Sequence, residues 1–145
     1  MSLMNVFDIA GSGMSAQSLR LNLIASNLAN ADATSASDGR TYRARYPVFT
    51  SETPEFSDAL FAVQDGPTDS VRVKVAGIVE SQAPLRRQYQ PEHPLADAEG
   101  YISLPNVNPI EEMANMISAS RSYQTNAQIM DTSKQLLLRT LTLGQ

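Results

Sequence analysis

The sequence contains no cysteine, no tryptophan and a single histidine among its 145 residues. Without cysteine the chain forms no disulfide and binds no metal through thiolates, so an oxidising and a reducing compartment suit it equally. Aromatic residues make up only 6% of the chain, which limits the size of any single hydrophobic core. These absences exclude the disulfide-rich and the thiolate-metal classes of protein.

Long apolar runs and a surplus of basic charge are also missing. No apolar stretch reaches the ~20 residues that cross a bilayer, and the first residues lack the basic start and long apolar segment of a cleavable signal peptide. The formal net charge of −4 opposes binding to the phosphates of nucleic acid. We therefore expect no transmembrane segment and no nucleic-acid partner, in a protein that either stays in the cytoplasm or is exported without cleavage.

Charge is distributed unevenly along the chain. Residues 1–35 carry only three charged side chains, Asp8, Arg20 and Asp32, whereas residues 36–105 carry ten acids and seven bases. A solvated surface helix normally carries more charge than the first segment does. The pattern predicts ends that are buried against a partner and a middle that meets water.

The last quarter of the sequence predicts a long helix. Asn108 suits the N-cap, Pro109 the first helical position and Glu111 a capping box. No Pro or Gly follows until Gly144, so residues 109–143 can form one helix of about 50 Å. Its mostly apolar positions recur at alternating steps of three and four, a heptad spacing that favours another helix as partner. A second ridge on a neighbouring face, through Ile129 and beyond, is more than so small a chain can cover.

Residues 2–30 repeat this heptad spacing. Ser and Asn occupy the opposite face, where small polar groups permit close approach and hydrogen bonds between helices. Gly11 and Gly13 each weaken a helix by ~1 kcal/mol, and a kink or tight packing would explain them. Isolated helices of this kind are marginal in water, so we expect both ends to be largely disordered before assembly. We expect contacts between helices, within one chain or between chains, at Leu3, Phe7, Ala10, Met14, Leu21, Ile24, Leu28, Met113, Met116, Ile117, Tyr123, Ala127, Met130, Leu137 and Leu141.

The middle of the chain is predicted to be a small β module. Residues 41–46 are strand-like, residues 71–80 alternate strictly, and residues 85–89 and 101–104 are shorter candidates. Residues 50–70 are predicted as a long loop with a turn of helix at 56–63, and residues 90–100 as a Pro-rich acidic turn. The fold class is therefore α+β: long antiparallel, coiled-coil-like N- and C-terminal helices with a small inserted β module. The expected segments are an N-terminal helix in 1–35, a β-rich outer module in 36–105 and a C-terminal helix in 106–145.

Several stretches of this sequence resemble the flagellar basal-body rod and hook proteins, and among them the proximal-rod protein C type. Residues 25–32 are similar to the N-terminal signature, and residues 42–49 are similar as well. Residues 90–101 and 104–108 look like the stretch peculiar to the C type, and residues 112–126 match the C-terminal half of the pattern. The residues that carry the resemblance are Ala25, Ser26, Asn27, Leu28, Ala29, Asn30, His93, Pro94, Gly100, Tyr101, Pro105, Asn106, Asn108, Glu112, Met113, Arg121, Tyr123 and Asn126.

The resemblance implies a structural subunit of the periplasmic rod, exported by the flagellar type III apparatus without cleavage. Such proteins polymerise into a hollow helical driveshaft that transmits torque, with terminal helices inside and the middle outside. The implied partners are copies of the chain, other rod proteins, and the inner-membrane ring and export apparatus at the rod base. A contact that does not close on itself generates such a filament. The alternative is a monomeric or dimeric cytoplasmic coiled-coil adaptor.

Three motifs permit other interpretations. Gly11, Gly13 and Ala16 fit the dinucleotide pattern G-x-G-x-x-A, but no βαβ unit follows, so we favour helix packing. His93 lies near three acids in a Pro-rich loop, where a solvated or interface loop is favoured over a metal site. We expect no catalytic residue, no metal site and no cofactor. A further set of basic residues forms either a salt-bridged strand face, the more frequent outcome, or a patch that docks on acidic residues 52–69 of a neighbour: Arg40, Arg43, Arg45, Arg86 and Arg87.

Overall fold

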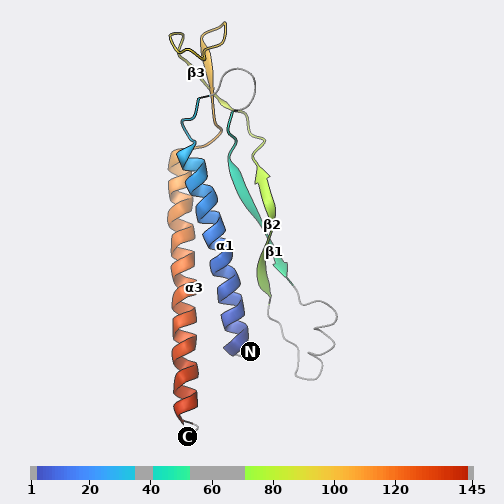
Figure 1. Ribbon diagram of the computed structural model, residues 1–145, viewed down its shortest axis with the longest axis vertical. Helices are drawn as coiled ribbons and strands as arrows, with labels where there is room; N and C mark the ends of the chain where they lie inside the picture. The colour runs from blue at the N-terminus through green and yellow to red at the C-terminus, as the bar shows by residue number, and fades with distance from the viewer. Residues whose placement is uncertain (1–2, 35–40, 53–70, 144–145) are drawn as a thin grey trace. The chain divides into compact units, whose positions relative to one another are not determined.

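The computed structural model describes residues 3–34, 41–52 and 71–143. Within them the chain forms a helix at each end and short strands between (Figure 1). In chain order the elements are α1 (Leu3–Ala29), β1 (Arg45–Glu52), β2 (Arg72–Glu80), β3 (Arg86–Tyr89), β4 (Tyr101–Leu104) and α3 (Pro109–Leu143). The α+β class and the two terminal helices are confirmed.

Local chemistry explains where the helices begin. Asn108 caps α3 as predicted, since its Oδ1 accepts the N–H of Ile110 at 3.2 Å and its backbone oxygen accepts the N–H of Glu112 at 3.0 Å. Among the described contacts, none joins Glu111 back to Asn108, so the expected capping box is not formed. In the part of the chain that the structure describes, neither helix has the length and apolarity needed to cross a membrane.

The strands form two separate sheets. One pairs β1 with β2, and the other pairs β3 with β4 in antiparallel register, with Arg87 opposite Ser103 and Tyr89 opposite Tyr101. The strands predicted at 71–80, 85–89 and 101–104 are confirmed within a residue. The strand predicted at 41–46 was placed too early, because β1 begins at Arg45. Residues 50–52 were predicted as the start of the long loop but continue β1 to Glu52. The rest of that loop, with the helical turn predicted at 56–63, lies outside the described residues.

The chain divides into two compact units, and both include parts of α1 and α3. The first unit comprises residues 1–19, 48–77 and 119–145; the second comprises residues 20–47 and 78–118. In the first unit, Ser12 Oγ accepts the N–H of Val73 at 3.2 Å, which attaches β2 to α1. In the second, Ala31, Ala44 and Val107 form a small buried cluster with Tyr42 packed against it. The three segments expected from the sequence remain a prediction.

The two helices run antiparallel and meet through small side chains. In the first unit, a Cβ added at Gly13 would lie 2.9 Å from Asn126 Nδ2, and one added at Gly11 would lie 3.8 Å from Met130 Cε. In the second unit, Arg20 donates to Asn115 Oδ1 at 3.2 Å. Tight packing therefore explains Gly13. The helix positions with less than a tenth of their surface exposed are Ala10, Ala16, Ile24, Asn27, Glu112, Ala119 and Ser133.

Candidate functional site

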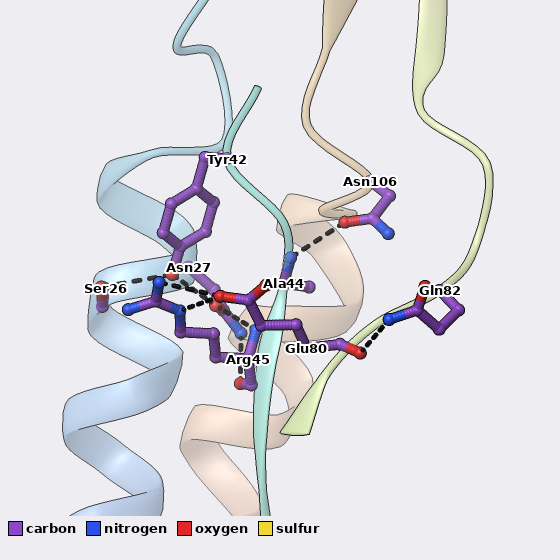
Figure 2. Close-up of polar contacts among 8 residues, drawn as sticks. All are labelled: Ser26, Asn27, Tyr42, Ala44, Arg45, Glu80, Gln82 and Asn106. Carbon is purple, nitrogen blue, oxygen red and sulfur yellow. Dashed lines mark hydrogen bonds and ion pairs between the residues drawn. The ribbon is translucent and has the colours of Figure 1, made fainter. Parts of the chain in front are cut away.

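The densest polar contact network in the described residues surrounds Asn27, near the end of α1 (Figure 2). Its side chain is fully buried. Its Nδ2 donates to the backbone oxygen of Arg45 at 3.0 Å, and its Oδ1 accepts the N–H of the same residue at 2.9 Å. The amide thus binds the start of β1 as a neighbouring strand would. Its Oδ1 also accepts the Tyr42 hydroxyl at 2.8 Å. We call Asn27, Tyr42, Arg45, Tyr46 and Glu112 the junction.

Glu112 brings α3 into the junction. Its carboxylate is 1% exposed; Oε2 accepts the second Asn27 Nδ2 hydrogen at 3.1 Å, and Oε1 accepts the Tyr46 hydroxyl at 3.2 Å. A buried carboxylate is costly unless it is hydrogen-bonded, and its place in the first turns of α3 adds the favourable field of the helix N-terminus. Burial, and next the Glu112 charge, raises the pKa of Tyr46 to about 12. The tyrosine therefore stays a neutral donor at physiological pH.

Asn106 forms a second polar connection just before α3. Its Oδ1 accepts the N–H of Ala44 at 2.9 Å (Figure 2), and its Nδ2 donates to the backbone oxygen of Ala83 at 3.0 Å. The Ser81 N–H donates to the Ala44 oxygen at 2.8 Å. One asparagine thus connects the segment before β1 with the segment after β2. Both backbone groups of Ala44 are used in these contacts, and the regular strand begins at the next residue, Arg45.

The four described arginines of the predicted basic set bind groups of their own chain. Arg86 donates to the Ala31 oxygen beyond the end of α1 and to the Pro105 oxygen, both at 3.3 Å, which suits the negative end of a helix. Arg43 donates to the backbone after β2. Arg45 pairs with Glu80 at 2.9 Å, and Arg87 with Asp97 at 3.0 Å. The salt-bridged interpretation therefore holds for Arg45, Arg87 and Arg86, whose guanidinium also lies 3.9 Å from Asp32 Oδ1. Arg43 instead binds backbone oxygens, and Arg40 lies outside the described residues.

His93 and Gly100 shape the turn between β3 and β4. His93 Nδ1 accepts the N–H of Leu95 at 3.1 Å. Asp97 Oδ1 accepts the N–H groups of Glu99 and Tyr101 at 3.0 and 2.9 Å, and the Tyr101 bond chiefly holds the pKa of Asp97 below its usual range. Gly100 has a φ of +80°, which a side chain would disfavour. In the residues that the structure describes, no three His, Asp or Glu side chains are grouped to hold a metal.

The structure separates the residues that carry the family resemblance into several groups. Asn27, Asn106 and Glu112 form the polar contacts above, while Ser26 approaches the Tyr42 hydroxyl at 3.3 Å and Asn30 bonds the Ser26 oxygen of its own helix at 2.8 Å. Leu28 is half-buried, and Ala25 and Ala29 are exposed. In the hairpin, Gly100 and Pro105 are buried, whereas Pro94 and Tyr101 are exposed. On α3, Asn126 packs against Gly13, whereas Met113, Arg121 and Tyr123 are exposed.

The residues expected at helix contacts divide between inner and outer positions. Ala10 and Ile24 are buried; Phe7, Met14, Leu21, Met116, Ala127, Met130 and Leu137 are half-buried; Met113, Ile117, Tyr123 and Leu141 are exposed. The side chain of Leu3 lies outside the described part. The inner face of α3 passes through Ala119, Asn126 and Ser133, one residue before three positions of the predicted seam. A contact between chains at any of these residues remains a prediction.

The nucleotide-binding interpretation of the glycines fails on local structure. Gly11 and Gly13 lie inside the continuous helix α1, so they do not form the strand-to-helix turn whose N–H groups bind a phosphate in the dinucleotide motif. The sequence does not identify Tyr42 and Arg45 as partners of Asn27, although residues 42–49 resemble the rod and hook proteins. Because the described junction consists of hydrogen bonds between distant segments, it fixes structural elements and offers no activated nucleophile.

Comparison with known proteins agrees with this architecture. A family model described as "Flagella basal body rod protein" matches residues 7–35, and one described as "Flagellar basal body rod FlgEFG protein C-terminal" matches residues 98–143. The flagellar basal-body rod protein FlgC of Escherichia coli O6:H1 is 51% identical over 145 residues, covering both chains fully. FlgC of Salmonella typhimurium is 50% identical over 146 residues, again covering both chains, and that of Borreliella burgdorferi is 35% identical over 156 residues, covering all of this chain and 99% of the relative.

The matched segments contain α3 and most of α1, and with them Asn27 and Glu112 of the junction. The relatives extend the similarity over the whole length, including the strands between the helices. Identity of this degree over complete chains indicates membership of the same family, because a shared local motif would match only part of the chain. The chain therefore belongs to the flagellar basal-body rod proteins and is a structural subunit of the rod, not an enzyme.

Proposed function

We propose that this chain polymerises through the outer faces of its terminal helices into a hollow helical driveshaft that transmits torque. The observation that carries the proposal is the distribution of side chains on α3. Its most buried positions are Glu112, Ala119 and Ser133, whereas many of its large apolar side chains lie outside, and Met116, Met130 and Leu137 are half-buried. We call the apolar side chains of α3 that are exposed by more than a third the outer stripe; they lie around all sides of the helix except the inner one: Ile110, Met113, Ile117, Tyr123, Ile129, Leu136, Leu138 and Leu141.

Burial of the outer stripe would supply the energy of assembly. Completing the burial of a half-exposed Leu or Ile gains about 1 kcal/mol. The eight side chains together would contribute roughly 8 kcal/mol per subunit before the entropy of association is subtracted. A contact of this type between unlike faces builds an open helix of subunits. A lone coiled-coil adaptor leaves this stripe uncovered.

The junction would carry load between the strands and the helices. Asn27, Arg45 and Glu112 connect α1, β1 and α3 through buried hydrogen bonds, which resist shear better than flexible surface contacts. We propose further that the partners are copies of the chain and other rod proteins, with the inner-membrane ring and export apparatus at the base. In this proposal the chain lies in the periplasm and is exported without cleavage.

The test places an aspartate on the outer stripe. Leu138 is 52% exposed, so Leu138→Asp leaves the fold of the single chain largely unchanged but puts a charge into the proposed interface. Gln135→Asp introduces the same charge at another exposed position and serves as the control. Each variant is the only copy in the cell, and swimming and incorporation into isolated basal bodies are measured.

We expect Leu138→Asp to abolish swimming and incorporation while Gln135→Asp retains both. Normal motility and normal incorporation of Leu138→Asp would overturn the assignment of the outer stripe to assembly. Circular dichroism of both purified variants shows whether the helices of the single chain are equally affected.

A further inference from the structure

The β3–β4 hairpin has an outer face that the fold does not use. Ile102 and Leu104 are buried on one side of the hairpin, whereas Tyr89 and Tyr101 lie on the other with 62% and 38% of their surface exposed. The two rings meet edge to face at 5.3 Å, and the Arg87 guanidinium lies 5.2 Å from the Tyr101 ring. Exposed tyrosines beside an arginine are the composition of interaction hot spots.

The turn at the end of this hairpin is already ordered for binding. Every described hydrogen bond of residues 90–100 has its partner within residues 87–101, and the Asp97 carboxylate accepts three of these bonds. A Cβ at Gly100 would lie 2.9 Å from Tyr89 Cε2, so the ring packs directly on this glycine. An open hollow results, lined by Tyr89, Gln90, Pro91, Glu92, His93 and Pro94. A rigid surface loses little entropy when it binds. We call residues 89–101 the hairpin tip.

Charge indicates what the hairpin tip binds. Residues 90–100 contain three acids, Glu92, Asp97 and Glu99, and no Lys or Arg. Because Asp97 pairs with Arg87, the negative charge offered to a partner is that of Glu92 and Glu99. In α3 beyond Glu112 the charge has the opposite sign, because Arg121, Lys134 and Arg139 outnumber Asp131. All four of these α3 side chains are exposed. In a chain with a net charge of −4, the exposed face of α3 is thus a complementary surface for the hairpin tip of another copy.

We propose that the hairpin tip docks on α3 of a second copy, around Ile117 and Arg121. Ile117 is 57% exposed and Arg121 follows one helical turn later, so an apolar and a basic group lie on the same face. Tyr89 covers Ile117, and Glu92 pairs with Arg121. This proposal rests on the proposed function, because it requires that copies meet in the rod. It identifies the hairpin tip as the group that covers Ile117 of the outer stripe.

Because the chain contains no cysteine, two introduced cysteines can be cross-linked without competition from other thiols of the same chain. The double variant Glu92→Cys/Arg121→Cys is expressed as the only copy, and isolated basal bodies are treated with a short bismaleimide that spans the length of a Glu–Arg pair and analysed on denaturing gels. The matched control is Glu92→Cys/Asp131→Cys, whose second cysteine is also exposed but lies about 15 Å further along α3. A cross-linker is used because a disulfide needs Cα atoms within about 7 Å, closer than an extended Glu–Arg pair holds them.

We expect at least a tenfold higher yield of cross-linked dimer from Glu92→Cys/Arg121→Cys than from the control. Equal yields in basal bodies that contain both variants would overturn the docking proposal and leave the rod assignment intact. Absence of the unmodified chain from basal bodies would overturn the proposed function itself.

A charge exchange provides a second measurement for the case in which the cysteine variants do not assemble. Glu92→Arg and Arg121→Glu are each expected to lower incorporation into basal bodies several-fold, and the combination is expected to restore it. Restoration supports the pairing, whereas a combined loss that equals the product of the single losses overturns it.

Discussion

Asn27 offers the sharpest test of the junction. Asn27→Ala removes four hydrogen bonds, two to the Arg45 backbone, one to Tyr42 and one to Glu112. At about 1 kcal/mol for each bond, and with Glu112 still bonded to Tyr46, the loss in the free energy of unfolding is roughly 3–4 kcal/mol. That is a large part of the stability of a small domain.

The assay is urea unfolding followed by circular dichroism, together with hydrogen exchange at the amides of Ala44 and Val107 in the second unit. Asn22→Ala is the control, because Asn22 is an exposed asparagine of the same helix. We expect the control to change stability by less than about 0.5 kcal/mol. If Asn27→Ala and Asn22→Ala have the same effect, the junction does not stabilise the chain and the reasoning is refuted.

Asn27→Asp tests the direction in which the stability of the chain changes with pH. The new carboxylate would face Glu112, where the amide now donates at 3.1 Å, so the folded variant must hold one proton between the two groups. The folded state then binds more protons than the unfolded chain at neutral pH. Its stability therefore rises as pH falls from 8 towards 5, by up to about 1.4 kcal/mol per pH unit. A flat profile over this range would contradict the proximity of the two side chains.

Three further results are expected. Spectrophotometric titration should find that Tyr46 has a pKa of about 12. Because this folded value lies above the ordinary 10.0, the contribution of Tyr46 to stability is present below pH 10 and is lost between pH 10 and 12. The loss is small, since the residue is 40% exposed. Gly11→Ala should raise the free energy of unfolding by about 0.5–1 kcal/mol in urea titrations, whereas Gly13→Ala should gain less or lose stability because it displaces Asn126. Gly100→Ala should lower the free energy of unfolding by about 1–2 kcal/mol, because its φ of +80° disfavours a side chain, and faster exchange of the hairpin amides would reveal this.

Features with a local cause could be predicted from the sequence. The start of α3 follows from Asn108 and Pro109, and β2 follows from the alternation of Val with polar residues in 71–75. The burial of Asn27 could not be predicted in the same way. An asparagine on a face rich in Ser and Asn is typically solvated, and its partners lie 15 to 85 residues away in the chain.

The sequence predicts the inner face of α3 one residue away from its observed position, and the reason is related. Heptad analysis follows large apolar residues, and here several of those residues, such as Met116, Met130 and Leu137, are only half-buried, while Ala119, Asn126 and Ser133 form the inner face. A face of small residues carries little hydrophobic signal, so the larger side chains next to this face dominated the pattern. Exposed leucines on a helix that already has a partner are therefore informative about assembly.

The separation of the junction residues along the chain has a consequence for biogenesis. Asn27 is synthesised early, but its bond to Glu112 spans 85 positions, so this connection cannot form until three quarters of the polypeptide is available. In an emerging chain that lacks its last segment, the Asn27 amide and the Tyr46 hydroxyl are without the Glu112 carboxylate that accepts from both. The junction is therefore completed only late in synthesis, after the helix, the strand start and the carboxylate that it joins have all been made.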